Sequence, residues 1–271
     1  HNAFASIYEG RYLAGVAAGL KLKEMTEKNP ETSHKIGYVG AYPYAEVKSG
    51  YTSYFLGVQS IVSDVTMEVT FTSSWYDETA EKNAAYSLIE RGCSIISQHA
   101  DSLGAPTACQ DKTVPNVSYN GSTKNAGPDS YLVSSRINWQ PYFEYCFDAV
   151  LNGKEIAKDW TGDLGDTLYN GSVCLAELGN IVAEGTETKL NEVHSQLKSG
   201  ALKVFDCSKF TVNGEHLTEY KADVNSDPNY EKDTQVIKTE NGVTYFAESE
   251  FRSAPYFDID IDGITLLTSQ Q

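Results

Sequence analysis

The sequence is short of positive charge and of long apolar runs. Its 271 residues carry 21 lysines and arginines against 37 aspartates and glutamates, which gives a net charge of −16. A chain this acidic repels phosphate backbones, and its densest basic stretch, residues 21–35, also holds three glutamates. We therefore predict no nucleic-acid partner. No run of about 18 apolar residues occurs, so the sequence predicts no membrane-spanning helix.

Cysteines are few and widely spaced, and common catalytic and metal-binding motifs are missing. The five cysteines form no Cys-x-x-Cys pair, which disfavours a zinc site and a disulfide framework. We expect them to be small buried hydrophobic residues. There is no Gly-x-Ser-x-Gly and no His-Glu-x-x-His. His99 and Asp101 could pair, but no nucleophile accompanies them. We predict no metal, no cofactor, no catalytic residue and no enzymatic activity.

Strand-like and helix-like stretches alternate in the first half of the sequence. Strands are expected at Lys35–Gly40, Val65–Thr72, Cys93–Gln98 and Asn116–Tyr119, and helices at Ala45–Ile61, Thr79–Arg91 and Gly104–Asp111. Such alternation predicts βαβ units and therefore an α/β fold with a parallel sheet covered on both faces. A further helix is expected at Glu9–Leu22. Later strands are expected at Tyr131–Ser134 and Gly171–Leu175, and later helices at Tyr142–Leu151 and Thr186–Lys198.

From about residue 206 the apolar residues no longer recur at helical spacing. Residues 206–271 are predicted to be a small β-rich, acidic C-terminal extension, with a hairpin at Asn241-Gly242. The segment Asp258–Gly263 matches the opening of a calcium-binding EF-hand loop, but position twelve is Ser269, where a glutamate is required. Its alternation of aspartate and isoleucine predicts an edge strand instead.

Aromatic and polar residues follow the four predicted strands of the first half. Ligands of open parallel sheets bind beyond the carboxyl ends of the strands, so we take Trp75, Asp77, Asp101 and Asn120 as candidate ligand-binding residues. Trp75 would stack on a planar ligand, and the other three would form hydrogen bonds to it. Asp77 also fits the N-cap of the next helix, and Asp101 and Asn120 also suit turns. None of these loops is a glycine-rich phosphate cradle.

Several longer segments have distinctive sequences. They read YEGRYLAGVAAG (8–19), IGYVGAYPYAEV (36–47) and SSWYDETAEKNAAYSLIERGCSIISQHADS (73–102). Together they resemble the basic membrane protein family, the substrate-binding lipoproteins of ABC transporters typified by purine nucleoside receptors. NWQPYFEYCFDAVLNGK (138–154) and SAPYFDIDIDGI (253–264) resemble a branch of that family with an acidic C-terminal extension.

The resemblance implies a type I periplasmic-binding-protein fold, with two lobes of parallel sheet flanked by helices and a ligand cleft at the hinge. Residues 1–34 and 128–160 would belong to the first lobe, and residues 35–127 and 161–205 would form the second. Family members begin with a long segment before the equivalent of residues 8–19. We therefore expect the N-terminal part of the first lobe, and the lipid-bearing cysteine, to be absent from this sequence.

The resemblance also implies roles for particular residues. Trp75 falls where nucleoside-binding members place a phenylalanine that stacks on the purine, and Asn120 falls where they usually have a ribose-binding aspartate. Ser122 replaces a second common aspartate, and the ribose-contacting lysine expected near Ile137 or Asn138 is missing. Asn138 and Trp139 would then lie beside the cleft. This combination favours a nucleobase, a modified nucleoside or another flat heterocycle.

The implied function is that of a solute-binding receptor of an ABC importer, which captures a purine nucleoside or nucleobase by hinge closure. Its partners would be the small-molecule ligand and an ABC permease. The protein would be extracytoplasmic and tethered to the membrane by an N-terminal lipid. Two other classes stay open, a ligand-sensing module for a signalling partner and a nucleoside-processing enzyme.

Overall fold

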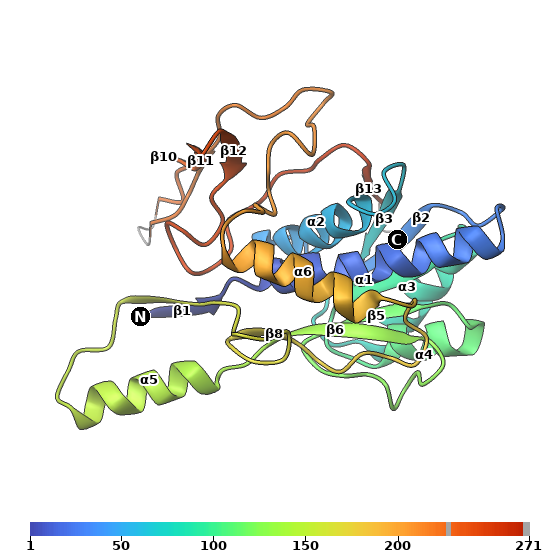
Figure 1. Ribbon diagram of the computed structural model, residues 1–271, viewed down its shortest axis with the longest axis horizontal. Coiled ribbons are helices and arrows are strands. Elements are labelled where there is room, and N and C mark those ends of the chain that lie inside the picture. Colours follow the sequence, from blue (N-terminus) through green and yellow to red (C-terminus); the bar gives the residue numbers. More distant parts are fainter. Residues whose placement is uncertain (226–228, 268–271) are drawn as a thin grey trace.

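A seven-stranded sheet forms the centre of the computed structural model, which describes residues 1–225 and 229–267 (Figure 1). In spatial order its strands are β13 (Ile264–Leu266), β3 (Thr66–Phe71), β2 (Lys35–Gly40), β4 (Ile95–His99), β5 (Asn116–Tyr119), β6 (Tyr131–Ile137) and β8 (Val173–Leu175). All neighbouring strands run parallel except β6 and β8. The central strands β2 and β4 are almost wholly buried, as strands covered on both faces must be. The predicted α/β fold with a parallel sheet is confirmed.

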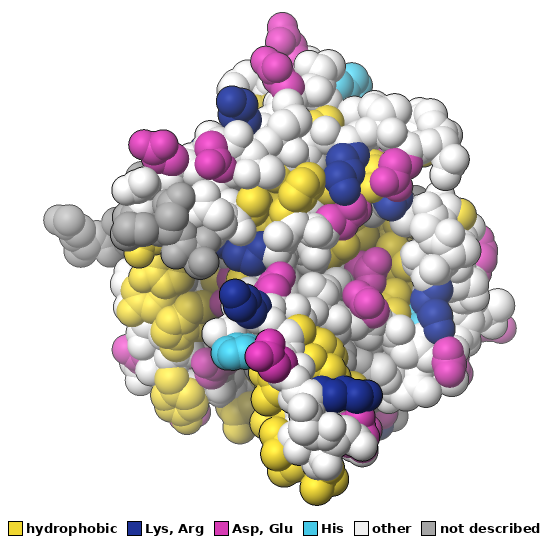
Figure 2. Space-filling model, turned by 90° about the vertical axis from the view of Figure 1, so that its left-hand side faces the viewer, with side chains coloured by type: hydrophobic (Ala, Val, Ile, Leu, Met, Phe, Trp, Pro, Cys, Tyr) yellow, Lys and Arg dark blue, Asp and Glu magenta, His cyan; other side chains and the backbone are white. Residues whose placement is uncertain are grey.

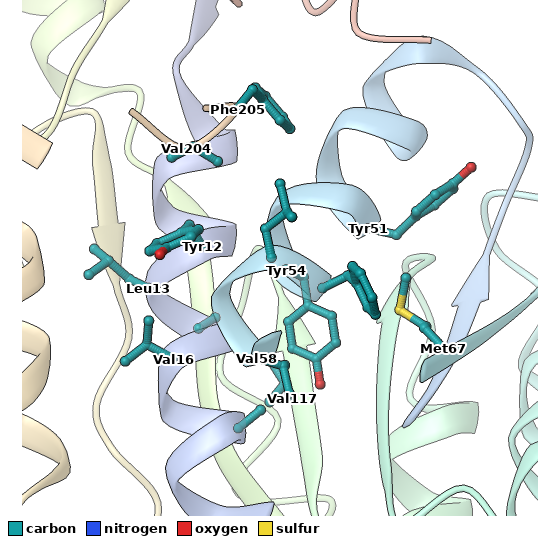
Figure 3. Close-up of a cluster of buried hydrophobic side chains, with 14 of the residues drawn as sticks. Tyr12, Leu13, Val16, Tyr51, Tyr54, Val58, Met67, Val117, Val204 and Phe205 are labelled. Atoms are coloured by element: carbon teal, nitrogen blue, oxygen red, sulfur yellow. The ribbon is translucent and has the colours of Figure 1, made fainter. Parts of the chain in front are cut away.

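Helices cover the two faces of this sheet. One face carries α1 (Ile7–Lys28), α2 (Ala45–Gln59) and α6 (Thr186–Lys198), and the other carries α3 (Glu78–Glu90) and α4 (Gly104–Lys112). Their buried side chains form two separate hydrophobic clusters, the larger beneath α1, α2 and α6. Figure 3 shows side chains of α1, α2 and the sheet meeting in this larger core, with Val204 and Phe205 above them. The sheet therefore has a core on each face.

Helices α1 and α2 touch backbone to backbone. A Cβ atom on Gly15 would lie 2.1 Å from the carbonyl oxygen of Tyr54, and one on Gly57 would lie 2.2 Å from that of Tyr12. Both distances are far below van der Waals contact, so this crossing requires glycine at both positions. The close approach fixes α2, whose first residues lie at the carboxyl edge of the sheet.

A second, smaller unit lies beside the central sheet, and Ala5 of this unit packs against Val173 of β8. It contains the parallel pair β1 (Asn2–Ala5) and β7 (Asp159–Gly162), together with α5 (Gln140–Leu151). Only Ala149 of α5 is buried. The exposed apolar side chains of α5 include Phe143, Phe147, Val150 and Leu151. Figure 2 shows hydrophobic side chains gathered at the bottom of the molecule, where α5 projects in Figure 1. The sequence did not predict β1 or β7.

The C-terminal segment is built from short strands. These are β9 (Lys221–Ala222), β10 (Thr234–Gln235), β11 (Ile237–Glu240) and β12 (Val243–Phe246). The predicted hairpin is confirmed, because β11 and β12 pair antiparallel around Asn241 and Gly242, whose φ angles are +52° and +82°. The segment also contacts the main core, where the ring of Phe257 stacks on that of Phe205 at 4.3 Å. Its last strand, β13, belongs to the central sheet.

The edge strand predicted at residues 258–263 is wrong. These residues pair with no strand, and the edge strand is β13, which follows them. The alternation has a different cause, since Ile259 and Ile261 are buried in the core. The intervening aspartates each accept a hydrogen bond at 2.6 Å: Asp258 from Tyr220, Asp260 from Lys48 and Asp262 from Thr211. Side-chain contacts hold this segment extended. Ser269 lies outside the described residues.

Other sequence predictions differ from the structure by small amounts. The first helix begins two residues before the predicted Glu9 and continues to Lys28. Helix α5 begins at Gln140, two residues before the predicted start, with Pro141 in its first turn. All five cysteines are free and four are buried, but Cys146 on α5 is only half-buried, so the prediction of burial fails there. Among the described residues, no helix is long and apolar enough to cross a membrane.

A buried carboxyl group lies where the C-terminal segment meets the core. Glu248 is 1% exposed; its Oε2 accepts a hydrogen bond from the backbone nitrogen of Tyr256 at 3.2 Å, and its Oε1 has no partner. Burial raises the pKa of Glu248 from 4.5 to about 7. Because the folded protein keeps this proton to a higher pH than the unfolded chain does, the contribution to stability is complete below pH 4.5. It is lost as the pH rises through about 7.

We therefore predict that Glu248→Gln removes part of the pH dependence of folding. Relative to this variant, the wild-type free energy of unfolding should fall by about 3 kcal/mol between pH 4.5 and 8, since each pKa unit is worth about 1.4 kcal/mol. Urea unfolding at several pH values measures the difference. Glu155→Gln, at an exposed position, is the control. Its free energy of unfolding should show the same dependence on pH as that of the wild type. If Glu248→Gln shows the wild-type pH dependence as well, Glu248 does not contribute to it and the prediction is refuted.

Candidate functional site

Backbone hydrogen bonds tie together the loops at the carboxyl ends of β2, β3 and β4. The nitrogen of Ala41 donates to the oxygen of His99 at 3.1 Å, and that of Ser73 donates to the oxygen of Ala41 at 3.0 Å. The nitrogen of Asp101 donates to the oxygen of Trp75 at 2.8 Å. Three loops from separate strands therefore form one connected surface at the edge where parallel sheets bind ligands.

Five rings gather on this surface, and we call them the aromatic cluster: Tyr42, Tyr44, Trp75, His99 and Tyr119. Tyr42 and Tyr44 are stacked, with ring centroids 5.1 Å apart and planes 15° apart. The Trp75 centroid lies 5.7 Å from that of Tyr42 and 6.2 Å from that of His99. His99 lies 4.1 Å from Tyr119. Trp75 is half-buried, so part of its side chain is accessible. Such a group of rings suits a flat ligand.

Charged groups lie beside the cluster. The His99 side chain is buried, and its Nε2 is 3.5 Å from Oε1 of Glu46 in the first turn of α2. Burial lowers the pKa of His99, although the nearby Glu46 carboxylate acts in the opposite direction. Loss of water contact raises the pKa of the Asp101 carboxyl. No hydrogen bond joins His99 to Asp101.

A buried arginine supports the cluster from below. The Arg11 guanidinium on α1 donates to Oη of Tyr38 at 2.8 Å, to Oγ of Ser97 at 2.9 Å and to the carbonyl oxygen of Ser118 at 3.2 Å. Its central carbon lies 5.5 Å from the centroid of Tyr119. The sequence analysis missed Arg11, Glu46 and Tyr119. Arg11 could have been found from the sequence, because it is an arginine within the otherwise apolar face of the first helix.

With this arrangement established, comparison with known proteins identifies the family. The sequence profile of the family described as ABC transporter substrate-binding protein PnrA-like matches residues 3–205. The chain belongs to this family. The match confirms the resemblance to the basic membrane protein family. It covers α1, the central sheet except β13, and the small unit that contains α5.

Relatives within the PnrA-like family differ in the ligands for which they are named. A purine-binding protein of Brucella abortus is 32% identical over 202 residues, which cover 74% of this chain and 53% of the relative. A Haloferax volcanii protein named for glucose binding by an ABC transporter is 31% identical over 205 residues, covering 75% of this chain and 49% of the relative. The chain thus spans about half the length of these curated relatives.

Solved structures support the same fold for this PnrA-like chain. A solute-binding protein of an ABC transporter system from Aeropyrum pernix superposes with a TM-score of 0.63 at 16% identity, covering 75% of this chain and 65% of that one. This likeness concerns the fold alone. The predicted type I periplasmic-binding-protein architecture is confirmed, and the PnrA-like family is one of substrate-binding proteins rather than an enzyme class.

The structure brings some predicted site residues of this PnrA-like chain together and separates others. Trp75 and Asp101 are joined by their backbone hydrogen bond. Asn120 is exposed, follows Tyr119 of the aromatic cluster, and has a φ of +68°, with its nitrogen donating to the oxygen of Ser135 at 2.7 Å. These three residues therefore belong to one edge of the sheet.

The remaining three candidates have structural partners. The Oδ1 of Asp77 caps α3 by accepting from the nitrogen of Ala80 at 2.9 Å. The Nδ2 of Asn138 donates to the oxygen of Gly171 at 3.1 Å. Trp139 meets the ring of Phe4 edge-on at 6.5 Å. Among the described ring contacts, none joins Trp139 to the aromatic cluster. A ligand role for Asn138 and Trp139 stays a prediction.

The capping geometry of Asp77 gives a testable prediction. Asp77→Ala should lower the free energy of unfolding by about 1 kcal/mol, because the first turn of α3 loses its acceptor. Asp77→Asn keeps an acceptor and should remain close to wild type. Glu78→Ala removes an equal charge from the same turn and serves as the control in urea unfolding. Wild-type stability in Asp77→Ala would show that the cap contributes nothing.

Proposed function

We propose that this chain is the ligand-binding part of a receptor for an ABC importer and that it binds a flat heterocyclic solute, a purine base or nucleoside. The observation that carries the proposal is the half-buried Trp75 among the aromatic rings at the carboxyl edge of the sheet. Stacking of a base on an aromatic side chain is worth about 1–3 kcal/mol. Membership of a substrate-binding family and the purine-binding relative support this ligand class.

The polar groups beside Trp75 would select the ligand among flat molecules. The Asp101 carboxyl and the exposed Asn120 amide offer acceptors and donors for the edge of a heterocycle. Ser122, at the position of the family's second aspartate, donates to Oε1 of Glu177 at 2.7 Å. Neither Asn120 nor Ser122 supplies a carboxylate for ribose hydroxyls. The two positions at which the family binds ribose therefore lack a carboxylate in this chain.

The mechanism would be hinge closure. In a two-lobed receptor, a ligand that contacts both lobes shifts the open–closed equilibrium toward the closed form. Here the central sheet would form one wall of the cleft, and the unit of β1, β7 and α5 would belong to the other lobe. The closed form would deliver the solute to an ABC permease. The receptor would work outside the cytoplasm, tethered through an N-terminal lipid of the full-length protein.

Substitution of Trp75 tests the proposal. Trp75→Ala should weaken binding of adenine and adenosine at least about tenfold, since it removes the stacking surface. Trp75→Phe retains a ring and should keep most of the affinity. Isothermal titration calorimetry gives the dissociation constants, and thermal unfolding checks that both variants are folded.

Two results would overturn parts of this assignment. Unchanged purine affinity in folded Trp75→Ala would remove the stacking role. Wild-type protein that binds glucose and no purine would match the Haloferax volcanii relative by name and exclude the purine class.

A further inference from the structure

A large hollow lies beside the aromatic cluster and is walled partly by the C-terminal segment. Its volume is about 960 Å³, and it lies between the β1–β7 pair, the start of α2 and residues 223–225, 230, 251, 252 and 254 of the C-terminal segment. β1 and the short C-terminal strands both lie on the left of Figure 1. The residues that matter here are Tyr44, Lys158, Asp223, Tyr230, Phe251 and Arg252. This volume is at the upper end of the range for small-molecule sites.

The C-terminal wall is fixed in place by β7. The Oδ1 of Asp159 accepts from Oγ of Ser253 at 2.6 Å, and its Oδ2 accepts from the nitrogen of Ser253 at 3.0 Å. Nδ2 of Asn2 in β1 donates to the same Oδ1 at 2.8 Å. Ser253 is fully buried. This clamp holds the neighbouring Phe251 and Arg252 against the hollow without a ligand, so the wall is formed in advance.

The hollow gathers charges that have no ion-pair partner. Among the described residues, neither Arg252 nor Lys158 forms a salt bridge, although the chain has an excess of acids. Arg252 uses two of its N–H groups on the carbonyl oxygens of Ala254 and Pro255, both at 3.3 Å. A guanidinium has five N–H donors, so others remain for a ligand. The Oδ1 of Asp223, a residue that lines the hollow, is buried and has no hydrogen-bond partner, so this wall holds an unsatisfied acceptor.

Tyr44 connects the hollow to the aromatic cluster. Its ring is stacked on Tyr42 and its centroid lies 6.4 Å from that of Trp75, while the same residue lines the hollow. Tyr44 is 57% exposed, so its ring is accessible. A flat group stacked at Trp75 could therefore carry a substituent that extends past Tyr44 into the hollow.

We propose that this hollow binds the sugar end of a nucleoside-class solute, with Asp223, Arg252 and Lys158 contacting its hydroxyl groups. The inference rests on the proposed function, and it assigns part of the ligand site to a segment outside residues 3–205, where the family profile matches. A carboxylate acceptor beside cationic donors suits a polyhydroxylated group. Asp223 thus provides the carboxylate that Asn120 and Ser122 lack.

The test compares adenosine with adenine, because the two differ only by the ribose. Arg252→Gln and Asp223→Asn should each weaken adenosine binding about tenfold, the usual effect of losing a hydrogen bond to a charged group. Adenine affinity should change less than about twofold in the same variants, because adenine does not reach the hollow. Phe251→Ala provides a third change in the same wall. Calorimetry on the 271-residue chain gives the dissociation constants.

Lys209→Gln is the matched control, since it also removes one positive charge but lines different hollows. It should leave both affinities unchanged. If adenosine and adenine bind all variants as they bind wild type, or if both ligands weaken equally, the inference is refuted and the proposed function stands. If the wild-type chain binds neither compound, the proposed function fails and the inference fails with it.

Discussion

A side chain that keeps its positive charge, Arg11, is buried between α1 and the sheet. The packing of α1 and the position of the candidate site depend on the acceptors that bind its guanidinium. Arginine keeps its proton at every physiological pH, and taking such an ion out of water costs several kcal/mol unless its donors are satisfied. Arg11 is fully buried, and among the described salt bridges none includes it. Neutral oxygens on β2, β4 and β5 accept hydrogen bonds from its two terminal nitrogens, while its Nε has no hydrogen-bond partner. The carboxyl ends of the same three strands carry the loops or rings of the aromatic cluster, so one interaction fixes both the packing of α1 and the floor of the candidate site.

The alternating part of the fold could be predicted because its signals are local. Between residues 35 and 119 each strand is short and contains β-branched or aromatic residues, and most helices repeat apolar residues at helical spacing, so the type and order of the elements follow from the sequence. The pairing of β1 with β7 could not be predicted in this way. It joins Asn2 to Asp159, and the four residues of β7 have no apolar alternation. The place of β13 beside β3 is equally non-local.

The structure brings together predicted candidates that lie in loops, whereas the sequence analysis missed residues inside regular elements. Trp75, Asp101 and Asn120 follow strand ends, where the topology of a parallel sheet brings loops together. Arg11 and Glu46 reach the same place from helices, and the sequence alone does not show which face of a helix points at a loop. Asp77 illustrates the opposite difficulty. A carboxylate before a helix suits both a cap and a ligand contact, and here the cap is formed.

The C-terminal segment constrains how the two parts of the chain can move. Through Ser253 it is bonded to Asp159 of β7, and through Phe257 and β13 it is packed into the central core. Any rotation of the β1–β7 unit against the sheet must therefore be taken up between Ser253 and Phe257, or it must break the bonds to Asp159. In the proposed two-lobed receptor, a strap of this kind would limit how far the cleft opens. It would also reduce the ordering cost of binding, because the wall of the hollow is held in place without a ligand. The acidic extension would then act on hinge closure through its contacts with both parts of the chain.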